Sequence, residues 1–168
     1  SLNFLFIVAV RSLFPDARVR MEHALSGGQY CEIDKEGYCK PQDVRKIEKR
    51  MKELIAANEV IHRRVVATAE AQAYFDRLGM KNKANLLACR KSATSSIYTL
   101  CGYDDYFYGI MLPDTSYLTH FSIRFYAPGV WLSAGNGFQN QAKLFHVFQE
   151  FETWGRLIGV SNIAELNA

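Results

Sequence analysis

Apolar residues recur along this chain with two different periods, which divide it into helices and strands. Where they return every three or four positions, as at Val44, Ile47, Met51 and Leu54, one face of a helix is hydrophobic. Short runs rich in β-branched and aromatic residues predict strands instead. The expected helices are 2–14, 41–58, 68–79 and 139–159. The expected strands are 19–25, 29–33, 60–66, 97–101, 106–112, 120–126 and 130–132. Residues 83–90 fit either a helix or a strand.

Glycine, proline and small polar residues mark the ends of these elements. Pro15 ends the first helix, because it cannot continue the backbone hydrogen bonds, and Ser26-Gly27-Gly28 predicts a hairpin turn. Pro41 suits a first helical turn, and Thr68 is expected to cap the next helix. A small-residue loop is expected over 133–137. The predicted fold class is α+β, with an antiparallel sheet flanked by helices and a C-terminal helical connector.

Composition fits a folded globular protein and excludes a disordered or strongly basic chain. The 168 residues are 49% hydrophobic and 22% charged, with a formal net charge of +3. The densest basic run, 45–52, is interleaved with Glu48. A solvated helix face with ion pairs is therefore favoured over a track for phosphates. The apolar run 4–10 is too short to cross a bilayer, so no membrane partner is expected.

The cysteines do not have the spacing of a metal site. Cys31, Cys39, Cys89 and Cys101 lack a separation of two to four residues. Cys31 and Cys39 flank a predicted turn, so a disulfide between them is conceivable. Nothing else indicates secretion, and we expect four reduced thiols in a cytoplasmic protein. The chain does not begin with Met, which favours an excised piece of a longer protein.

Side chains with catalytic potential are scattered along the chain. His23, His62, His120 and His146 are far apart in sequence, and structural or surface roles are favoured for each. Asp104 and Asp105 are adjacent, so on a strand their side chains point to opposite faces. An aromatic group could in principle stack on bases, although core packing is the more common role for such a set: Tyr103, Tyr106, Phe107, Tyr108 and Tyr117.

The segment 105–116 reads Asp-Tyr-Phe-Tyr-Gly-Ile-Met-Leu-Pro-Asp-Thr-Ser. It resembles the Asp-Leu-Cys-Arg-Gly-Pro-His-Val-Pro-x-Thr-Gly signature of the threonyl-tRNA synthetase editing domain, the second additional domain shared with alanyl-tRNA synthetase. Asp105, Gly109, Pro113 and Thr115 keep the frame. Four further blocks resemble the same domain in the same order: 13–17, 27–33, 47–53 and 70–75, with the strand 121–126 after the signature. The resemblance covers 1–132, and 133–168 is expected to be the connector.

The resemblance also implies that the reactive groups of that domain are missing. Phe107 replaces its cysteine, Met111 its histidine, and Phe4 the second histidine of its opening His-x3-His. We therefore predict no catalytic residue and no metal ligand, with Phe4, Phe107 and Met111 filling a former cleft as an apolar plug. Candidate ligand-binding residues of the altered cleft are Asp105, Tyr106, Tyr108, Gly28 and Tyr30.

The aromatic-rich segment 143–167 resembles the connector that precedes the P-loop domain of uridine-kinase-like nucleoside kinases, with Trp154-Gly155-Arg156 as its core. The chain contains no G-x4-G-K-[ST] loop, so ATP and Mg²⁺ are expected only in an absent C-terminal kinase domain. That resemblance favours a non-catalytic accessory domain of such a kinase, which acts in regulation, in assembly or in binding a tRNA-like or nucleotide ligand. The alternatives are an aminoacyl-tRNA deacylase and a tRNA-binding module that uses the aromatic residues.

Overall fold

Two antiparallel sheets organise the computed structural model, which describes residues 1–25, 28–127 and 129–134. The four-stranded sheet has the order β1-β2-β7-β6, and the three-stranded sheet has the order β3-β4-β5. The strands are β1 (Arg18–Leu25), β2 (Gly28–Asp34), β3 (His62–Ala67), β4 (Thr94–Leu100), β5 (Tyr103–Tyr106), β6 (Phe121–Tyr126) and β7 (Gly129–Ala134). The helices are α1 (Leu2–Leu13), α2 (Pro41–Ala56), α3 (Thr68–Arg77) and α4 (Lys81–Ala88), with a 3₁₀ turn η1 (Thr115–Tyr117). The predicted α+β class is confirmed.

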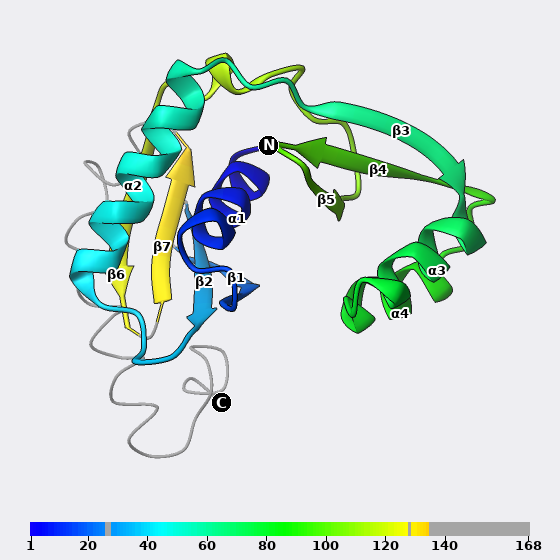
Figure 1. The fold of residues 1–168 in the computed structure, drawn as a ribbon, viewed down its shortest axis with the longest axis horizontal. Coiled ribbons are helices and arrows are strands. Elements are labelled where there is room, and N and C mark those ends of the chain that lie inside the picture. Colours follow the sequence, from blue (N-terminus) through cyan, green and yellow to red (C-terminus); the bar gives the residue numbers. More distant parts are fainter. Residues whose placement is uncertain (26–27, 128, 135–168) are drawn as a thin grey trace.

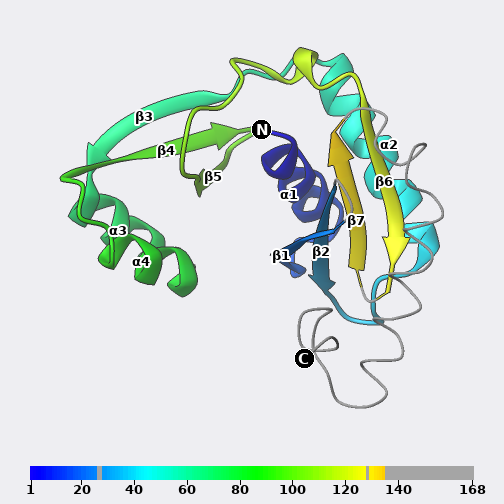
Figure 2. The same cartoon turned by 180° about the vertical axis from the view of Figure 1, so that it is seen from behind.

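Helices α1 and α2 cover one face of the four-stranded sheet, whereas α3 and α4 lie against the three-stranded sheet at the other end of the molecule (Figure 1). The view from behind shows the same arrangement, with β6 in front of α2 and β7 beside it (Figure 2). The larger core holds the inward residues of α1, α2, β2 and β7, together with Tyr98 and Leu100 of β4. A smaller core lies between α3, α4 and the inner face of β4 and β5.

Helix α1 is the centre of the larger core. Its residues Phe4 to Val10 are buried without interruption. A helix that is apolar on all sides is buried on all sides, and α1 contacts α2, β1 and β4. Its first turn also approaches the signature segment, because the backbone N–H of Leu112 donates to Ser1 Oγ at 2.8 Å.

Several sequence predictions need correction. The strand expected over 106–112 does not form: β5 ends at Tyr106, and the chain beyond it is a loop. Thr68 is not the cap of α3, since Ala67 takes that place and the Thr68 hydroxyl donates to the carbonyl of Ser92 at 2.7 Å. Ser133 belongs to β7 and not to the expected loop. The open choice at 83–90 is settled as helix by α4.

The other predicted elements lie within a few residues of those observed, and Pro41 occupies the first turn of α2 as expected. The helix predicted over 139–159 falls outside the described residues. The same is true of the predicted connector over 133–168 from the residue after Ala134 onward. No helix among the described residues is long and apolar enough to cross a membrane.

Candidate functional site

The signature segment is a loop tied at its far end to the region between α2 and β3. The N–H of Ile61 donates to the carbonyl of Pro113 at 2.8 Å, and the N–H of Thr115 donates to the carbonyl of Glu59 at 2.9 Å. The Thr115 side chain is fully buried. Its hydroxyl donates to the carbonyl of Leu54 at 2.8 Å and accepts from the N–H of Glu59 at 3.0 Å. Thr115 therefore joins the loop to the C-terminal end of α2.

Gly109 determines the shape of the middle of this loop. Gly109 has a φ of +101°, a conformation that residues with a side chain rarely adopt. Its carbonyl accepts a hydrogen bond of 2.6 Å from the Tyr98 hydroxyl of β4. The loop is thus bonded to β4, the neighbour of the strand β5 that it has just left.

Asp105 and Asp104 point to different surroundings, as expected for neighbours on a strand. Asp105 is 3% exposed; its Oδ1 lies 3.0 Å from Lys83 Nζ and accepts from the N–H of Tyr106 at 2.7 Å. Lys83 Nζ also donates to the Tyr106 carbonyl at 3.1 Å and lies 4.8 Å from the centre of the Phe107 ring. Asp105 and Lys83 together hold α4 against the start of the loop.

Asp104 instead joins β3, β4 and α3. Its carboxylate accepts hydrogen bonds from Arg64 at 2.8 Å, from Tyr74 at 2.5 Å and from Thr99. Burial by itself would raise the pKa of Asp104, but the hydrogen bonds from Thr99 and Tyr74 and the charge of Arg64 outweigh it and lower this pKa. The same bond to Asp104, with burial, raises the pKa of Tyr74.

Two of the three predicted plug residues meet in space. Phe4 is fully buried, and its ring centre lies 5.2 Å from that of Phe107 with a tilt of 51° between the planes. Met111 is partly buried and packs against the same core cluster as Phe4 and Phe107. Aromatic side chains therefore occupy the place where α1 faces the signature loop.

The candidate ligand-binding residues are not brought into one site. Tyr106 and Tyr108 lie at the end of the three-stranded sheet, while Gly28 and Tyr30 are in β2 of the other sheet. A side chain at Gly28 would come within 2.4 Å of the Trp131 ring. Tyr30 is buried, with ring centres 5.3 Å from Tyr126 and 5.5 Å from His23. Gly28 and Tyr30 thus serve the packing of the four-stranded sheet.

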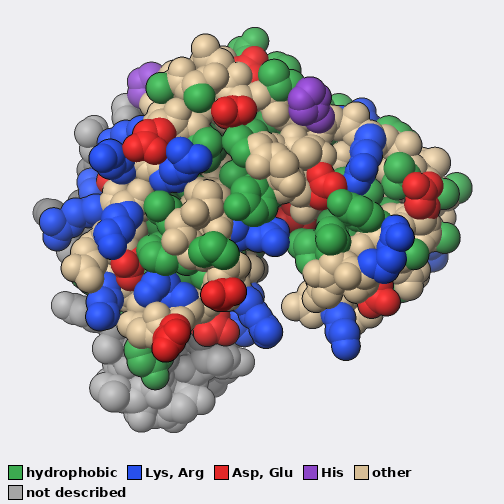
Figure 3. All heavy atoms as spheres, in the orientation of Figure 1, with side chains coloured by type: hydrophobic (Ala, Val, Ile, Leu, Met, Phe, Trp, Pro, Cys, Tyr) green, Lys and Arg blue, Asp and Glu red, His purple; other side chains and the backbone are tan. Residues whose placement is uncertain are grey.

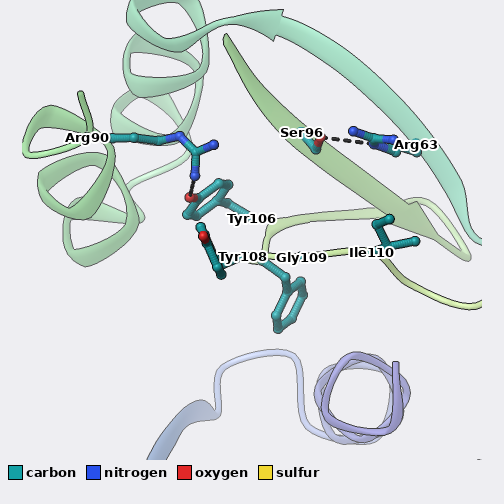
Figure 4. A pocket seen from close by; sticks show the side chains of 8 residues that line it. Arg63, Arg90, Ser96, Tyr106, Tyr108, Gly109 and Ile110 are labelled. Atoms are coloured by element: carbon teal, nitrogen blue, oxygen red, sulfur yellow. Dashed lines mark hydrogen bonds between the residues drawn. The ribbon is translucent and has the colours of Figure 1, made fainter. Parts of the chain in front are cut away.

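A pocket of about 260 Å³ lies beside Tyr106 and Tyr108. Figure 4 shows Arg90 approaching the two tyrosines from one side, with Arg63 and Ser96 on the other. The pocket is lined by Arg63, Arg90, Ser96, Tyr106, Phe107, Tyr108, Gly109 and Ile110. No spacing in the sequence indicates the two arginines, because the fold brings them from β3 and from the segment after α4.

The remaining chemically active side chains are dispersed. Among residues 1–25, 28–127 and 129–134, no three His, Cys, Asp or Glu side chains are grouped as a metal site would need. All four cysteines are free, so the conceivable Cys31–Cys39 disulfide is not formed. His62 and His120 are exposed, and the ring Nδ1 of His120 lies 2.8 Å from the hydroxyl of Thr119. His146 lies outside the described residues.

No family model matches the chain. The sequence is similar to part of several threonine–tRNA ligases, which supports a threonyl-tRNA-synthetase-like domain. A threonine–tRNA ligase of Pelobacter propionicus is 35% identical over 131 residues, covering 78% of this chain and 21% of the relative. Those of Geobacter sp. strain M21 and Acidovorax sp. strain JS42 are 32% identical over 148 residues and 36% identical over 132 residues. The matched part of this chain corresponds to 23% of the length of the Geobacter relative and 21% of the Acidovorax relative. The chain therefore spans about a fifth of the curated relatives it matches.

Proposed function

We propose that this chain is a tRNA-binding domain that does not hydrolyse aminoacyl esters. The observation that carries the proposal is the contact between Phe4 and Phe107, whose ring centres are 5.2 Å apart. These two positions hold a histidine and a cysteine in the editing domain that the sequence resembles. The similarity to threonine–tRNA ligases over 131 residues supports tRNA as the ligand class.

The chemistry of the replaced positions argues against hydrolysis. Cleavage of an ester needs a positioned general base or a metal-bound water. Phenyl rings offer neither a proton acceptor nor a metal ligand, and a thioether such as Met111 is only a weak acceptor. Lys83 Nζ lies 4.8 Å from the centre of the Phe107 ring, but it is engaged with the Asp105 carboxylate and the Tyr106 carbonyl.

The surface is compatible with a polyanionic ligand. In Figure 3, Lys and Arg side chains lie on both sides of the hollow between the two ends of the molecule. The formal net charge of +3 has the same sign. Contacts of this kind attract phosphates and carry no sequence information by themselves. A modest affinity that depends on salt is therefore expected.

Two measurements with the purified chain test the proposal. Fluorescence anisotropy with labelled tRNA should show binding that weakens as salt is raised, because phosphate contacts release counterions. Incubation with serine-charged threonine tRNA should release serine no faster than buffer alone. A lack of tRNA binding would refute tRNA as the ligand. If serine is released faster than in buffer, and this release is lost in Lys83→Ala, the chain does hydrolyse aminoacyl esters and that part of the proposal is refuted.

The nucleoside-kinase setting is a second proposal, supported by the residues of 143–167, which lie outside the described structure. In that setting the chain is the accessory segment of an ATP- and Mg²⁺-dependent kinase located in the cytoplasm. The relatives reported above are threonine–tRNA ligases and give no support for a kinase. The reading frame that follows Ala168 tests it: a P-loop within the next domain's length is expected, and its absence would refute the setting.

A further inference from the structure

The pocket between Arg63 and Arg90 has the side chains of an anion site next to an exposed aromatic ring (Figure 4). We propose that this pocket binds one nucleotide unit, with the phosphate between the two guanidinium groups and the base on the ring of Tyr108. Phe107 forms part of the wall of this pocket, whereas Phe4, which contacts Phe107, does not line it. The same chemistry is offered by a free mononucleotide and by one nucleotide of an RNA strand.

The two arginines have hydrogen-bond donors to spare. Arg63 Nε donates to the Ser96 hydroxyl at 3.0 Å, and Arg90 Nη1 donates to the Tyr106 hydroxyl at 2.5 Å. A guanidinium group has five N–H donors in a fixed fork that suits phosphate oxygens. Arg90 Nε is buried and has no hydrogen-bond partner within the described part of the chain. These side-chain bonds orient both groups and use one donor of each, while the buried Nε of Arg90 is not a donor that a ligand could reach.

The charge within the pocket is of one sign. None of the eight lining residues is an Asp or Glu. The nearby carboxylates are already engaged: Asp104 with Arg64, and Asp105 with Lys83. Arg63 and Arg90 lie on opposite sides of the pocket, so an anion inside it would be attracted by positive charge from both sides (Figure 4). This selects a phosphate over a neutral sugar or a free base.

Tyr108 provides the stacking surface. It is 91% exposed, and Arg90 lies 5.8 Å from its ring centre on the side of the pocket. Ile110 is 89% exposed and lies two residues further along the same loop. The loop holds the ring there because Gly109 has a positive φ and its carbonyl is bonded to Tyr98. A base on an exposed aromatic ring gains stacking energy whatever its identity.

The size of the pocket limits the ligand. Its volume of about 260 Å³ is below the usual range of roughly 300–1,000 Å³ for sites that enclose a drug-sized molecule. A phosphate and its ribose fit inside, while the base projects onto Tyr108. We therefore expect one nucleotide unit to be held at a time, with little preference among the bases.

Titration of the isotope-labelled chain with AMP, followed by amide NMR shifts, tests the site directly. AMP should change the amide chemical shifts around Tyr108 and Gly109. Adenosine alone or inorganic phosphate alone should bind with an affinity at least about tenfold lower, since each makes half of the contacts. A short RNA strand is the second arm: binding of the strand but not of AMP identifies RNA as the source of the nucleotide. Saturation by neither probe would overturn the proposal.

Variants distinguish this pocket from general attraction to phosphate. Arg63→Gln and Tyr108→Leu should each weaken AMP binding about tenfold, and Arg45→Gln, an exposed arginine on α2, should leave it unchanged. Equal weakening by Arg45→Gln would overturn the assignment. The result is independent of the tRNA proposal: AMP binding without tRNA binding refutes only that proposal, and AMP binding unaffected by Arg63→Gln refutes only this one.

Discussion

Replacement of Thr115 by valine removes the bonds that join the signature loop to α2 without changing the shape of the side chain. The hydroxyl is fully buried, and it donates to Leu54 and accepts from the N–H of Glu59 at 2.8 and 3.0 Å. Each such bond contributes a net of about 0.5–1.5 kcal/mol, and a buried backbone group left without a partner costs about 1–3 kcal/mol. Thr115→Val should therefore lower the free energy of unfolding by about 2–4 kcal/mol.

Thr115→Ser is the matched control, since it keeps the hydroxyl and loses only a methyl group, worth about 0.8 kcal/mol. Urea unfolding followed by circular dichroism measures both variants. With a slope of about 2 kcal/mol per molar urea, the midpoint should fall by roughly 1–2 M for valine and by less than about 0.5 M for serine. A valine variant as stable as the wild type, or a serine variant that is the weaker of the two, would refute the role given to this hydroxyl.

Three further outcomes are expected. Gly129→Ala should destabilise the fold by about 1–3 kcal/mol in urea unfolding, because its Cβ would lie 2.0 Å from the Cys31 carbonyl oxygen; a variant as stable as the wild type would contradict the close packing of β7 on β2. In the folded chain at pH 8, Ellman's reagent should react first with exposed Cys89 and last with Cys31. Burial raises the pKa of Cys31 to about 12, so little of its reactive thiolate is present at pH 8. Fast reaction of Cys31 would disprove its burial. Because the pKa of Asp104 is lowered by folding, its ionised form stabilises the fold at pH values above the unfolded-state pKa near 4, and this stabilisation is lost as the pH falls through the folded-state pKa. The free energy of unfolding of Asp104→Asn should therefore differ less from that of the wild type in acid than at neutral pH. A difference of constant size across this pH range would count against the network.

The sequence predicts α1, α2 and α3 well, because their apolar stripes are local, and it leaves α4 open between helix and strand. The error at 106–112 has a physical cause: Tyr106, Tyr108 and Ile110 alternate like a strand, but Tyr108 and Ile110 are exposed and Gly109 turns the chain. The hydroxyl of Thr68 found a distant partner in Ser92, which local capping preference cannot reveal.

The candidate site was predicted only in part. Similarity to an editing domain placed Phe4 and Phe107 near each other, and their rings are in contact. It also grouped Tyr30 with Tyr106, which the two sheets keep apart. Arg63 and Arg90 could not be found from spacing, since only the pairing of β3 with β4 and the path of the chain after α4 bring them to the same pocket.

The burial of α1 has a consequence for synthesis on the ribosome. Residues Phe4 to Val10 belong to the same core as Val130 and Leu132 of β7, which begins at Gly129, about 120 residues later. At ~5–20 residues per second, the core around this apolar helix remains incomplete for roughly 6–24 s while the intervening chain is made. The nascent protein is therefore exposed to aggregation for that interval, and holding chaperones would be expected to bind its first turns.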